Sequence, residues 1–449
     1  MSRRLTTFAA FALLGTGSMP AQAAATSGIS PARAFVPREV VLKFEGQRSA
    51  QTLSLPPGVG VRQAATALRR SPRVAYAAPN YIATASAQRP FRSASGIPND
   101  PGPIDGTPGQ PGGWVSLQWN LLPWSGTATA ALPISPGGID AIGAWRNLAA
   151  DGRYGGRGTV VAVLDTGVTF RTLRPHFIRS PDFASRQFTK GYDFVGGDRL
   201  PLDQNGHGTH IAGTIAEKTD NGIGLVGLAY GAKLMPVRVL DKHGSGQADV
   251  IARGIRFAVE NGADVINMSF NFGCGKRVPG IDDELRKAYR QGIVTVASIG
   301  NLGAETCVSP PATGPRVIGV GGTTEGGCLG SYSLSGKGID VVAPGGGAPA
   351  PGCPSIWARP IYQVTLKGGN PSRFGEPGTY IGTSMSAAHV SALAAMVLAS
   401  GVLDPDAAPQ STVNRVARRL RNTARDLGLP STRQGAGLID AAQATEPTP

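Results

Sequence analysis

Short apolar runs alternate with longer segments of helical periodicity over most of the chain after Gly158. The pattern predicts strands at 159–164, 237–240, 265–270 and 293–297, and helices at 208–217, 248–261 and 281–291. Strands that alternate with helices form βαβ units, and strands that are apolar almost throughout are typical of a sheet covered on both faces. We therefore expect an α/β fold with a mostly parallel central sheet and helices on both of its faces.

A separate small unit is expected before this region. Residues 39–44 and 74–81 have the pattern of strands, and residues 63–70 have helical spacing. This order predicts a small α+β unit within residues 24–97, followed by a larger domain over residues 98–449. The small unit is either a segment removed during maturation or a permanent accessory domain.

The first 23 residues have the features of a secretory signal. Arg3 and Arg4 form a basic start, residues 8–14 are apolar, and residues 21–23 form a small-x-small cleavage site. The apolar run is too short to span a bilayer, and we identify no other stretch of 18 or more apolar residues. We expect an exported protein without a membrane anchor, which would be extracellular or periplasmic.

The charge distribution argues against a nucleic-acid partner. The formal net charge of the chain is +14, but the first 97 residues hold 12 basic and only 2 acidic side chains, which leaves the rest at +4. A domain so nearly balanced offers no electrostatic basis for binding a phosphate backbone.

The chain has four cysteines, an even number that favours disulfides in an exported protein. A zinc site is less favoured, because the cysteines lack CxxC spacing and have no nearby histidine. Three pairings are possible. We favour the sequential one, Cys274–Cys307 and Cys328–Cys353.

Three short segments carry an acid, a base and a nucleophile in the order Asp165, His207, Ser384. They read VAVLDTGV, NGHGTHIAG and GTSMSAAH, and each lies at a strand end or a helix start. A serine hydroxyl becomes a useful nucleophile only when a base takes its proton, and an acid must hold that base in the correct tautomer. Each residue alone also fits a turn or a helix cap, but the three together predict a catalytic triad. Their order differs from the chymotrypsin and α/β-hydrolase orders.

With these motifs, the chain resembles the subtilisin-like serine proteases, the subtilase family, from about residue 98 to residue 444. Its N-terminal unit more weakly resembles the inhibitory prosegment of that family. The resemblance implies a secreted serine endopeptidase that acts on protein or peptide substrates through an acyl-enzyme. It also implies a preproenzyme that matures between Ala83 and Pro98, with its own propeptide as an intramolecular inhibitor. We expect a monomer.

The resemblance also assigns the oxyanion and substrate sites. Asn301 matches the family's side-chain oxyanion donor. The segments that match the substrate-binding edges are Ser269, Phe270 and Asn271, and Ser298, Ile299 and Gly300. The first edge usually reads Ser-Leu-Gly, and the second usually contains alanine. Leu302 replaces a residue that is often polar, and Ala388 replaces the usual proline of the serine helix. These departures remove no catalytic group, and an apolar pocket for the residue before the scissile bond (P1) is the default expectation.

A candidate calcium loop follows the histidine motif. Residues 219–225 resemble the family's calcium loop, in which an asparagine side chain and backbone carbonyls supply the oxygen ligands that a hard cation prefers. The expected ligands are the Asn221 side chain, the carbonyls of Thr219, Ile223 and Leu225, and the side chains of Asp182 and Gln118. The alternative is an Asn-Gly turn without an ion.

Two other functions fit less well. A binding protein that kept the fold without the chemistry would not need Asp165, His207, Ser384 and Asn301 together. An esterase or lipase of the α/β-hydrolase type is disfavoured by the missing Gly-x-Ser-x-Gly elbow and by the chain order.

Overall fold

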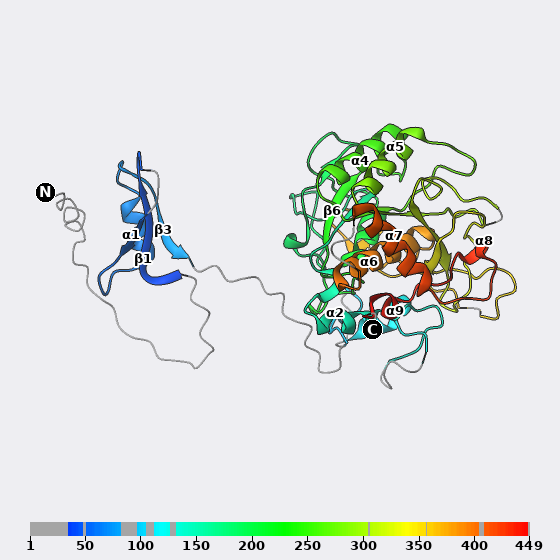
Figure 1. Ribbon diagram of the computed structural model, residues 1–449. Helices are drawn as coiled ribbons and strands as arrows, with labels where there is room; N and C mark the ends of the chain where they lie inside the picture. Colours follow the sequence, from blue (N-terminus) through cyan, green and yellow to red (C-terminus); the bar gives the residue numbers. More distant parts are fainter. Residues whose placement is uncertain are drawn as a thin grey trace. The chain divides into compact units, whose positions relative to one another are not determined.

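The computed structural model describes residues 35–47, 51–81, 97–104, 112–125, 132–303, 306–355, 357–403 and 408–447. The expected leader and most of the expected linker lie outside the described residues. The chain divides into two compact units, residues 1–88 and 89–449, each of which is drawn in Figure 1.

The first unit is a three-stranded antiparallel sheet with one helix. Strand β1 (Phe35–Phe44) lies between β2 (Gln51–Ser54) and β3 (Val74–Tyr81), and helix α1 (Val61–Leu68) packs on this sheet. Strand β2 was not expected from the sequence. The helix and the sheet share a small apolar core of Val40, Leu42, Leu55, Val61, Ala65 and Ala77.

The second unit is built on a seven-stranded sheet in the order β10-β9-β8-β7-β4-β6-β5, with all neighbours parallel. The strands are β4 (Val160–Asp165), β5 (Tyr192–Asp193), β6 (Lys233–Arg238), β7 (Val265–Met268), β8 (Val294–Ser298), β9 (Val317–Thr323) and β10 (Val341–Pro344). A separate antiparallel pair comprises β11 (Thr365–Leu366) and β12 (Phe374–Gly375). The expected α/β architecture is confirmed.

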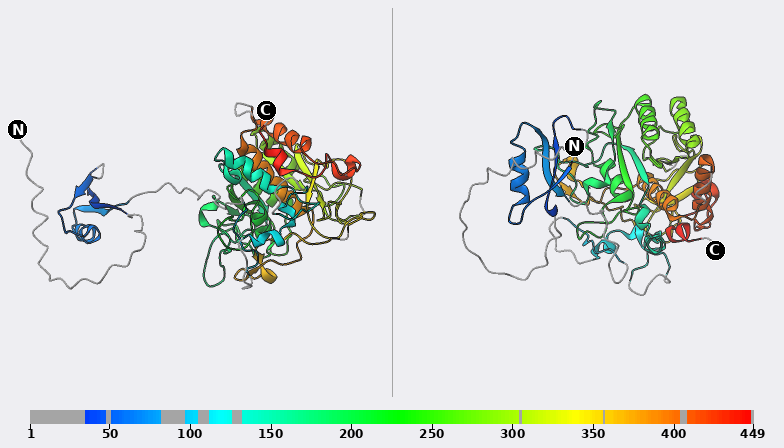
Figure 2. Two further views of the ribbon diagram at one scale, coloured as in Figure 1. Left: turned by 90° about the horizontal axis from the view of Figure 1, so that it is seen from below. Right: turned by 60° about the vertical axis from the view of Figure 1, so that its left-hand side comes forward.

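Helices flank this sheet. They are α2 (Ala141–Ala150), α3 (His207–Ala216), α4 (Ala248–Glu260), α5 (Pro279–Arg290), α6 (Thr383–Ser400), α7 (Pro409–Asn422), α8 (Ser431–Gln434) and α9 (Ala441–Thr445). Along the chain, β5 lies between β4 and α3, so α3 connects β5 to β6, whereas α4 connects β6 to β7 and α5 connects β7 to β8. Helix α3 packs beside α6, whereas α4 and α5 pack beside each other. Figures 1 and 2 show α4 and α5 side by side.

Helix α6 packs beside α3 and against β7, β8, β9 and β10. It is long and apolar enough to span a bilayer, but 83% of this 18-residue segment is buried inside the fold. We therefore interpret α6 as the central core helix of this unit.

Candidate active site

The three residues of the predicted triad lie at the carboxyl edge of the sheet. Asp165 is the last residue of β4, His207 is the first residue of α3, and Ser384 is the second residue of α6. Strand β7 lies beside β4 and β8 lies beside β7, so the segments that follow these parallel strands reach the same edge. Ligand sites of open α/β sheets form at this edge of the strands.

The acid and the base form a direct hydrogen bond. His207 Nδ1 lies 2.8 Å from Asp165 Oδ1, so Nδ1 donates and Nε2 remains for a second partner. Asp165 is fully buried, and the same oxygen accepts the Thr166 N–H at 2.7 Å. Burial alone would lower the pKa of His207, but the negative charges of Asp165 and Asp203 and the hydrogen bond to Asp165 raise it above its ordinary value.

A second buried carboxylate, Asp203, holds the start of α3 in place. Its Oδ1 accepts hydrogen bonds from the Thr166 hydroxyl and from the N–H groups of Asn205 and Gly206 at 2.9–3.0 Å. Its Oδ2 accepts from the Thr209 N–H at 2.9 Å and from the Thr209 hydroxyl at 2.7 Å. Asp203 therefore ties the strand end that carries Asp165 to the helix start that carries His207. The sequence analysis did not select this residue.

Glycine allows these two elements to approach. A side chain at Gly208 would place its Cβ 2.1 Å from the Gly167 carbonyl oxygen and 3.1 Å from Asp165 Cβ. The histidine helix can therefore reach the end of β4 only because position 208 has no side chain.

The nucleophile is held by Ser269, the first residue after β7. The Ser384 hydroxyl donates to the Ser269 carbonyl at 3.1 Å, and the Ser269 hydroxyl donates to the Ser384 carbonyl at 2.8 Å. Among the described residues, no hydrogen bond joins Ser384 to His207. The Ser384 hydroxyl is thus paired with the Ser269 carbonyl rather than with His207.

Asn301 lies directly against the start of α6. Its Oδ1 accepts the N–H and the hydroxyl of Thr383, both at 2.9 Å. These bonds fix the orientation of the side-chain amide, and its Nδ2 has no hydrogen-bond partner in the part of the chain that the structure describes. A Cβ at Gly382, whose φ is +143°, would lie 2.9 Å from that Nδ2. Glycine at this position thus leaves room for a donor beside the nucleophile.

The two expected substrate edges also lie at this end of the sheet, but they differ in exposure and in backbone hydrogen bonding. Phe270 is half-buried and Asn271 is exposed. Ile299 is fully buried, its N–H bonds to Val320 and its carbonyl accepts from Ser309. Both backbone hydrogen-bonding groups of Ile299 are already paired within the protein. Contact with a substrate along the second edge would therefore depend on the residues on either side of Ile299.

Two further histidines near the site are structural. His210 is buried, stacks on Tyr380 with ring centroids 4.1 Å apart, and pairs with the Ile361 carbonyl at 2.9 Å. In His389, Nδ1 donates to the Met385 carbonyl at 2.8 Å. Burial lowers the pKa of His210 to about 3 and that of His389 to about 4, so both are neutral at physiological pH.

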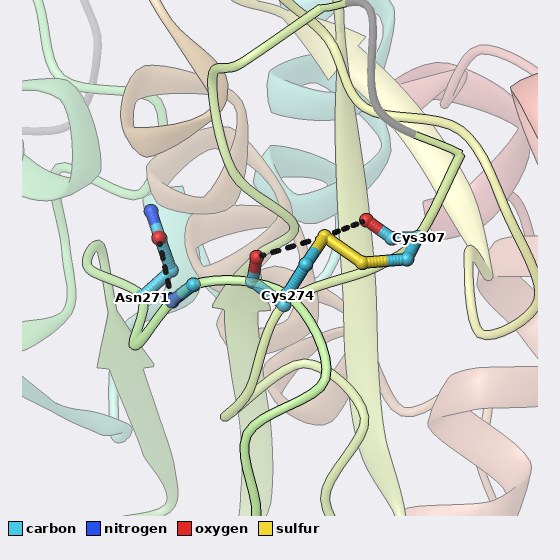
Figure 3. The surroundings of a disulfide bond; sticks show 5 residues. Asn271, Cys274 and Cys307 are labelled. Carbon is cyan, nitrogen blue, oxygen red and sulfur yellow. Dashed lines mark hydrogen bonds between the residues drawn. A yellow bond between two sulfur atoms is a disulfide. The ribbon is translucent and has the colours of Figure 1, made fainter.

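The cysteines pair sequentially, and the favoured pairing is confirmed. Cys274 bonds to Cys307, and Cys328 bonds to Cys353. Figure 3 shows the first disulfide, which joins the loop after Asn271 to the segment that follows Asn301.

The expected calcium loop has a partner that the sequence analysis missed. The Asp100 carboxylate accepts the N–H groups of Asp220 and Asn221 at 2.7 and 3.1 Å. Asp182 accepts the Asn221 side-chain amide at 2.8 Å. Gln118 is engaged elsewhere, because its amide oxygen and nitrogen both bond to the backbone of Val226.

These carboxylates are poorly solvated. Burial raises the pKa of Asp100 to about 6, although backbone hydrogen bonds oppose the shift. Burial also raises the pKa of Asp182 well above its usual range. Two desolvated carboxylates beside an asparagine and backbone carbonyls fit a hard cation. Within the described ranges, no group of three or more His, Cys, Asp and Glu side chains is placed to hold a metal ion, so any such site would depend on amide and carbonyl oxygens.

Residues 156–437 match the model of the subtilase family. The chain belongs to the subtilase family. It is 35% identical over 257 residues to a thermophilic serine proteinase of a Bacillus strain, covering 57% of this chain and 56% of that protein. It is 34% identical over 359 residues to an extracellular protease of Xanthomonas campestris, covering 73% of this chain and 55% of that protein. The chain thus spans little more than half the length of these two relatives.

A solved structure supports the same assignment for the fold. The structural match to a protease from Pseudoalteromonas arctica covers 78% of this chain and 98% of that protein, with a TM-score of 0.59 and 30% sequence identity. As a subtilase, the chain has the subtilisin-like α/β fold. The region before the matched residues is consistent with a prosegment.

Proposed function

We propose that this chain is a secreted serine endopeptidase that hydrolyses peptide bonds in protein substrates through Asp165, His207 and Ser384. The observation that carries the proposal is the 2.8 Å hydrogen bond between the buried Asp165 carboxylate and His207 Nδ1. This bond selects the tautomer whose Nε2 can accept a proton from Ser384, which begins the helix beside it.

In the proposed reaction, the Ser384 hydroxyl turns from the Ser269 carbonyl towards His207 and gives its proton to Nε2. Ser384 Oγ then attacks the substrate carbonyl carbon, and the oxygen of the tetrahedral intermediate accepts from Asn301 Nδ2 and the Ser384 N–H. The imidazolium gives its proton to the leaving amine, which leaves an ester on Ser384. Water, activated by His207, then hydrolyses that ester.

We propose that substrate lies extended between two edges, in the manner of an added strand. The edges are Ser269, Phe270 and Asn271 on one side and Ser298, Ile299 and Gly300 on the other. The positions of both segments after adjacent strands β7 and β8 support this arrangement. The P1 preference is expected to be apolar.

The proposed precursor has three parts: a signal peptide over residues 1–23, an inhibitory propeptide over residues 24–97, and a catalytic domain over residues 98–449. Removal of the propeptide would follow cleavage between Ala83 and Pro98. The separate compact fold of the first unit supports this organisation, and the extracellular relative from Xanthomonas supports export. The mature enzyme is expected to act as a monomer.

Calcium is proposed as a structural cofactor. Asp100, Asp182 and the Asn221 side chain would hold it, together with the carbonyls of Thr219, Ile223 and Leu225. Bound calcium would offset the charge of the two buried carboxylates and tie the start of the catalytic unit to the loop after α3.

The experiment is to express the precursor and a Ser384→Ala variant and to compare intact masses and casein hydrolysis. We expect the parent to lose its N-terminal unit and cleave casein, and the variant to do neither. Identical processing of both forms would show that another protease matures the chain. A folded, mature parent that hydrolyses neither casein nor a broad peptide panel would refute the enzymatic proposal and favour a binding protein.

A further inference from the structure

The Cys274–Cys307 disulfide lies between the two proposed substrate edges rather than at a distance from them. Cys274 follows the first edge by three residues, and Cys307 lies six residues after Asn301. The bond closes a separation of 33 residues and holds the two Cα atoms 5.8 Å apart. Figure 3 shows Cys274 and Cys307 together, with Asn271 on the same loop as Cys274.

The β7–β8 pairing ends at Met268 and Ala297, and beyond it the other connections between the edges are single hydrogen bonds. The Ser298 hydroxyl donates to the Phe270 carbonyl at 3.4 Å, a long contact. The segment after Cys307 bridges both edges, because Pro310 accepts the Phe272 N–H at 2.9 Å and Ser309 donates its N–H to Ile299 at 3.0 Å. This segment therefore contributes to the spacing between the edges where they leave the β7–β8 pairing.

The loop around Cys274 is rich in glycine and borders open space. Gly273 and Gly275 flank the cysteine with φ values of +80° and +70°, and a Cβ at either position would meet no atom within 4 Å. An open cavity of about 620 Å³, lined in part by Gly275, Lys276 and Thr306, lies beside the disulfide. The disulfide therefore restrains a glycine-rich loop whose other anchors are the side chains of Phe272, Cys274 and Val278, which pack against the core.

We propose that the Cys274–Cys307 disulfide is a positioning element for substrate binding, which fixes the spacing of the two edges and thereby sets KM and P1 discrimination. This inference rests on the proposed peptidase function. Asn301 is held separately, because its Oδ1 accepts two hydrogen bonds from Thr383. Loss of the disulfide should therefore affect substrate affinity more than the stabilisation of the tetrahedral oxygen.

The second disulfide supplies a matched control. Cys328–Cys353 closes a similar separation of 25 residues with a Cα–Cα distance of 6.0 Å. The hydrogen bonds described for these two cysteines go to Thr324, Ala350 and Ser355, none of which belongs to a substrate edge. Both bonds constrain loops of comparable length, so each should contribute to stability, but only the first should contribute to substrate binding.

The test compares the mature parent with two double variants, Cys274→Ser/Cys307→Ser and Cys328→Ser/Cys353→Ser. Active-site titration gives enzyme concentrations, and tetrapeptide anilides with apolar, polar and charged P1 residues give KM and kcat. We expect both variants to melt at lower temperature. Only the first variant should show a KM raised about tenfold and a narrower range of kcat/KM among P1 residues. A tenfold effect lies well within the roughly hundredfold loss of rate that a misplacement of about 1 Å can cause.

Unchanged KM and P1 discrimination in the first variant would overturn the inference, and so would an equal rise of KM in both variants. If the first variant does not fold, the mature parent is reduced and alkylated below its melting temperature. Mass mapping then shows which disulfide opened, and the same kinetics decide the question. An inactive parent would refute the proposed peptidase function. An active parent, together with variants whose KM and P1 discrimination equal those of the parent, would refute only the role of this disulfide.

Discussion

Replacement of Asp203 by asparagine tests whether this carboxylate positions the catalytic histidine. The change keeps the shape of the side chain but turns one acceptor oxygen into an NH2 donor. The amide oxygen is best kept on the side that serves three donors, from Thr166, Asn205 and Gly206. The new NH2 group then faces the N–H and the hydroxyl of Thr209, which now donate to Oδ2.

The effect on stability follows from these contacts. The Thr209 hydroxyl can rotate to accept a hydrogen bond, but its backbone N–H cannot, and Thr209 is fully buried. A buried donor left without an acceptor costs about 1–3 kcal/mol of unfolding free energy. We therefore expect a melting temperature lower by a few degrees, rather than loss of the fold.

The effect on activity has a defined sign. His207 acts as a base only when it is neutral, and the negative charges of Asp165 and Asp203 keep its pKa above the ordinary value despite burial. Asp203→Asn removes one of these charges, so the pKa of His207 should fall. The neutral imidazole then persists to lower pH, and the acidic limb of the kcat/KM profile should move to lower pH.

The assay is kcat/KM against pH for the parent, Asp203→Asn and a control, Asp193→Asn. Asp193 is also a buried carboxylate, but it pairs with Arg238 at 2.8 Å and is not among the charges that shift the pKa of His207. The control should lose stability without moving the acidic limb. An acidic limb that stays in place or moves to higher pH in Asp203→Asn, or that moves equally in both variants, would refute the reasoning.

Three further outcomes are expected. Asn301→Ala should lower kcat by about 10²–10³-fold at nearly constant KM, the range for loss of one such donor in a subtilisin; a change confined to KM, measured with the same anilides, would argue against an oxyanion role. A chelator should lower the melting temperature of the parent but have little further effect on Asp100→Asn, and an unchanged parent in calorimetry would exclude a stabilising calcium ion. Peroxide should lower activity slowly through sulfoxide formation at Met385, which is only 2% exposed, and a Met385→Ala variant should retain activity after the same treatment.

The alternation of strands and helices was predictable because each central strand is apolar on both faces. Strands β4, β7 and β8 follow this pattern. Strand β6 begins four residues earlier than expected, at Lys233. The prediction started too late because Pro236 interrupts the run, although the whole strand pairs with β4. Strands β9 and β10 were missed, since β9 contains three glycines and β10 has only four residues. Their pairing depends on the sheet already formed by β8 rather than on their own propensity.

The candidate catalytic residues could be selected from the sequence because they stand at strand ends and helix starts, where a local sequence pattern marks the position. In a parallel sheet the carboxyl ends of neighbouring strands meet, so Asp165 and Ser269 come to one edge once the order β8-β7-β4 is set. The supporting contacts have no such pattern. Asp203 accepts hydrogen bonds from the residue after β4 and from the loop and first turn of α3. Asp100 accepts a hydrogen bond from Asn221, which lies 121 residues away in the sequence. A buried carboxylate is recognised by the donors around it, and those donors share no spacing in the sequence. For this reason the triad could be proposed from the sequence, whereas the groups that hold its members in place required the structure.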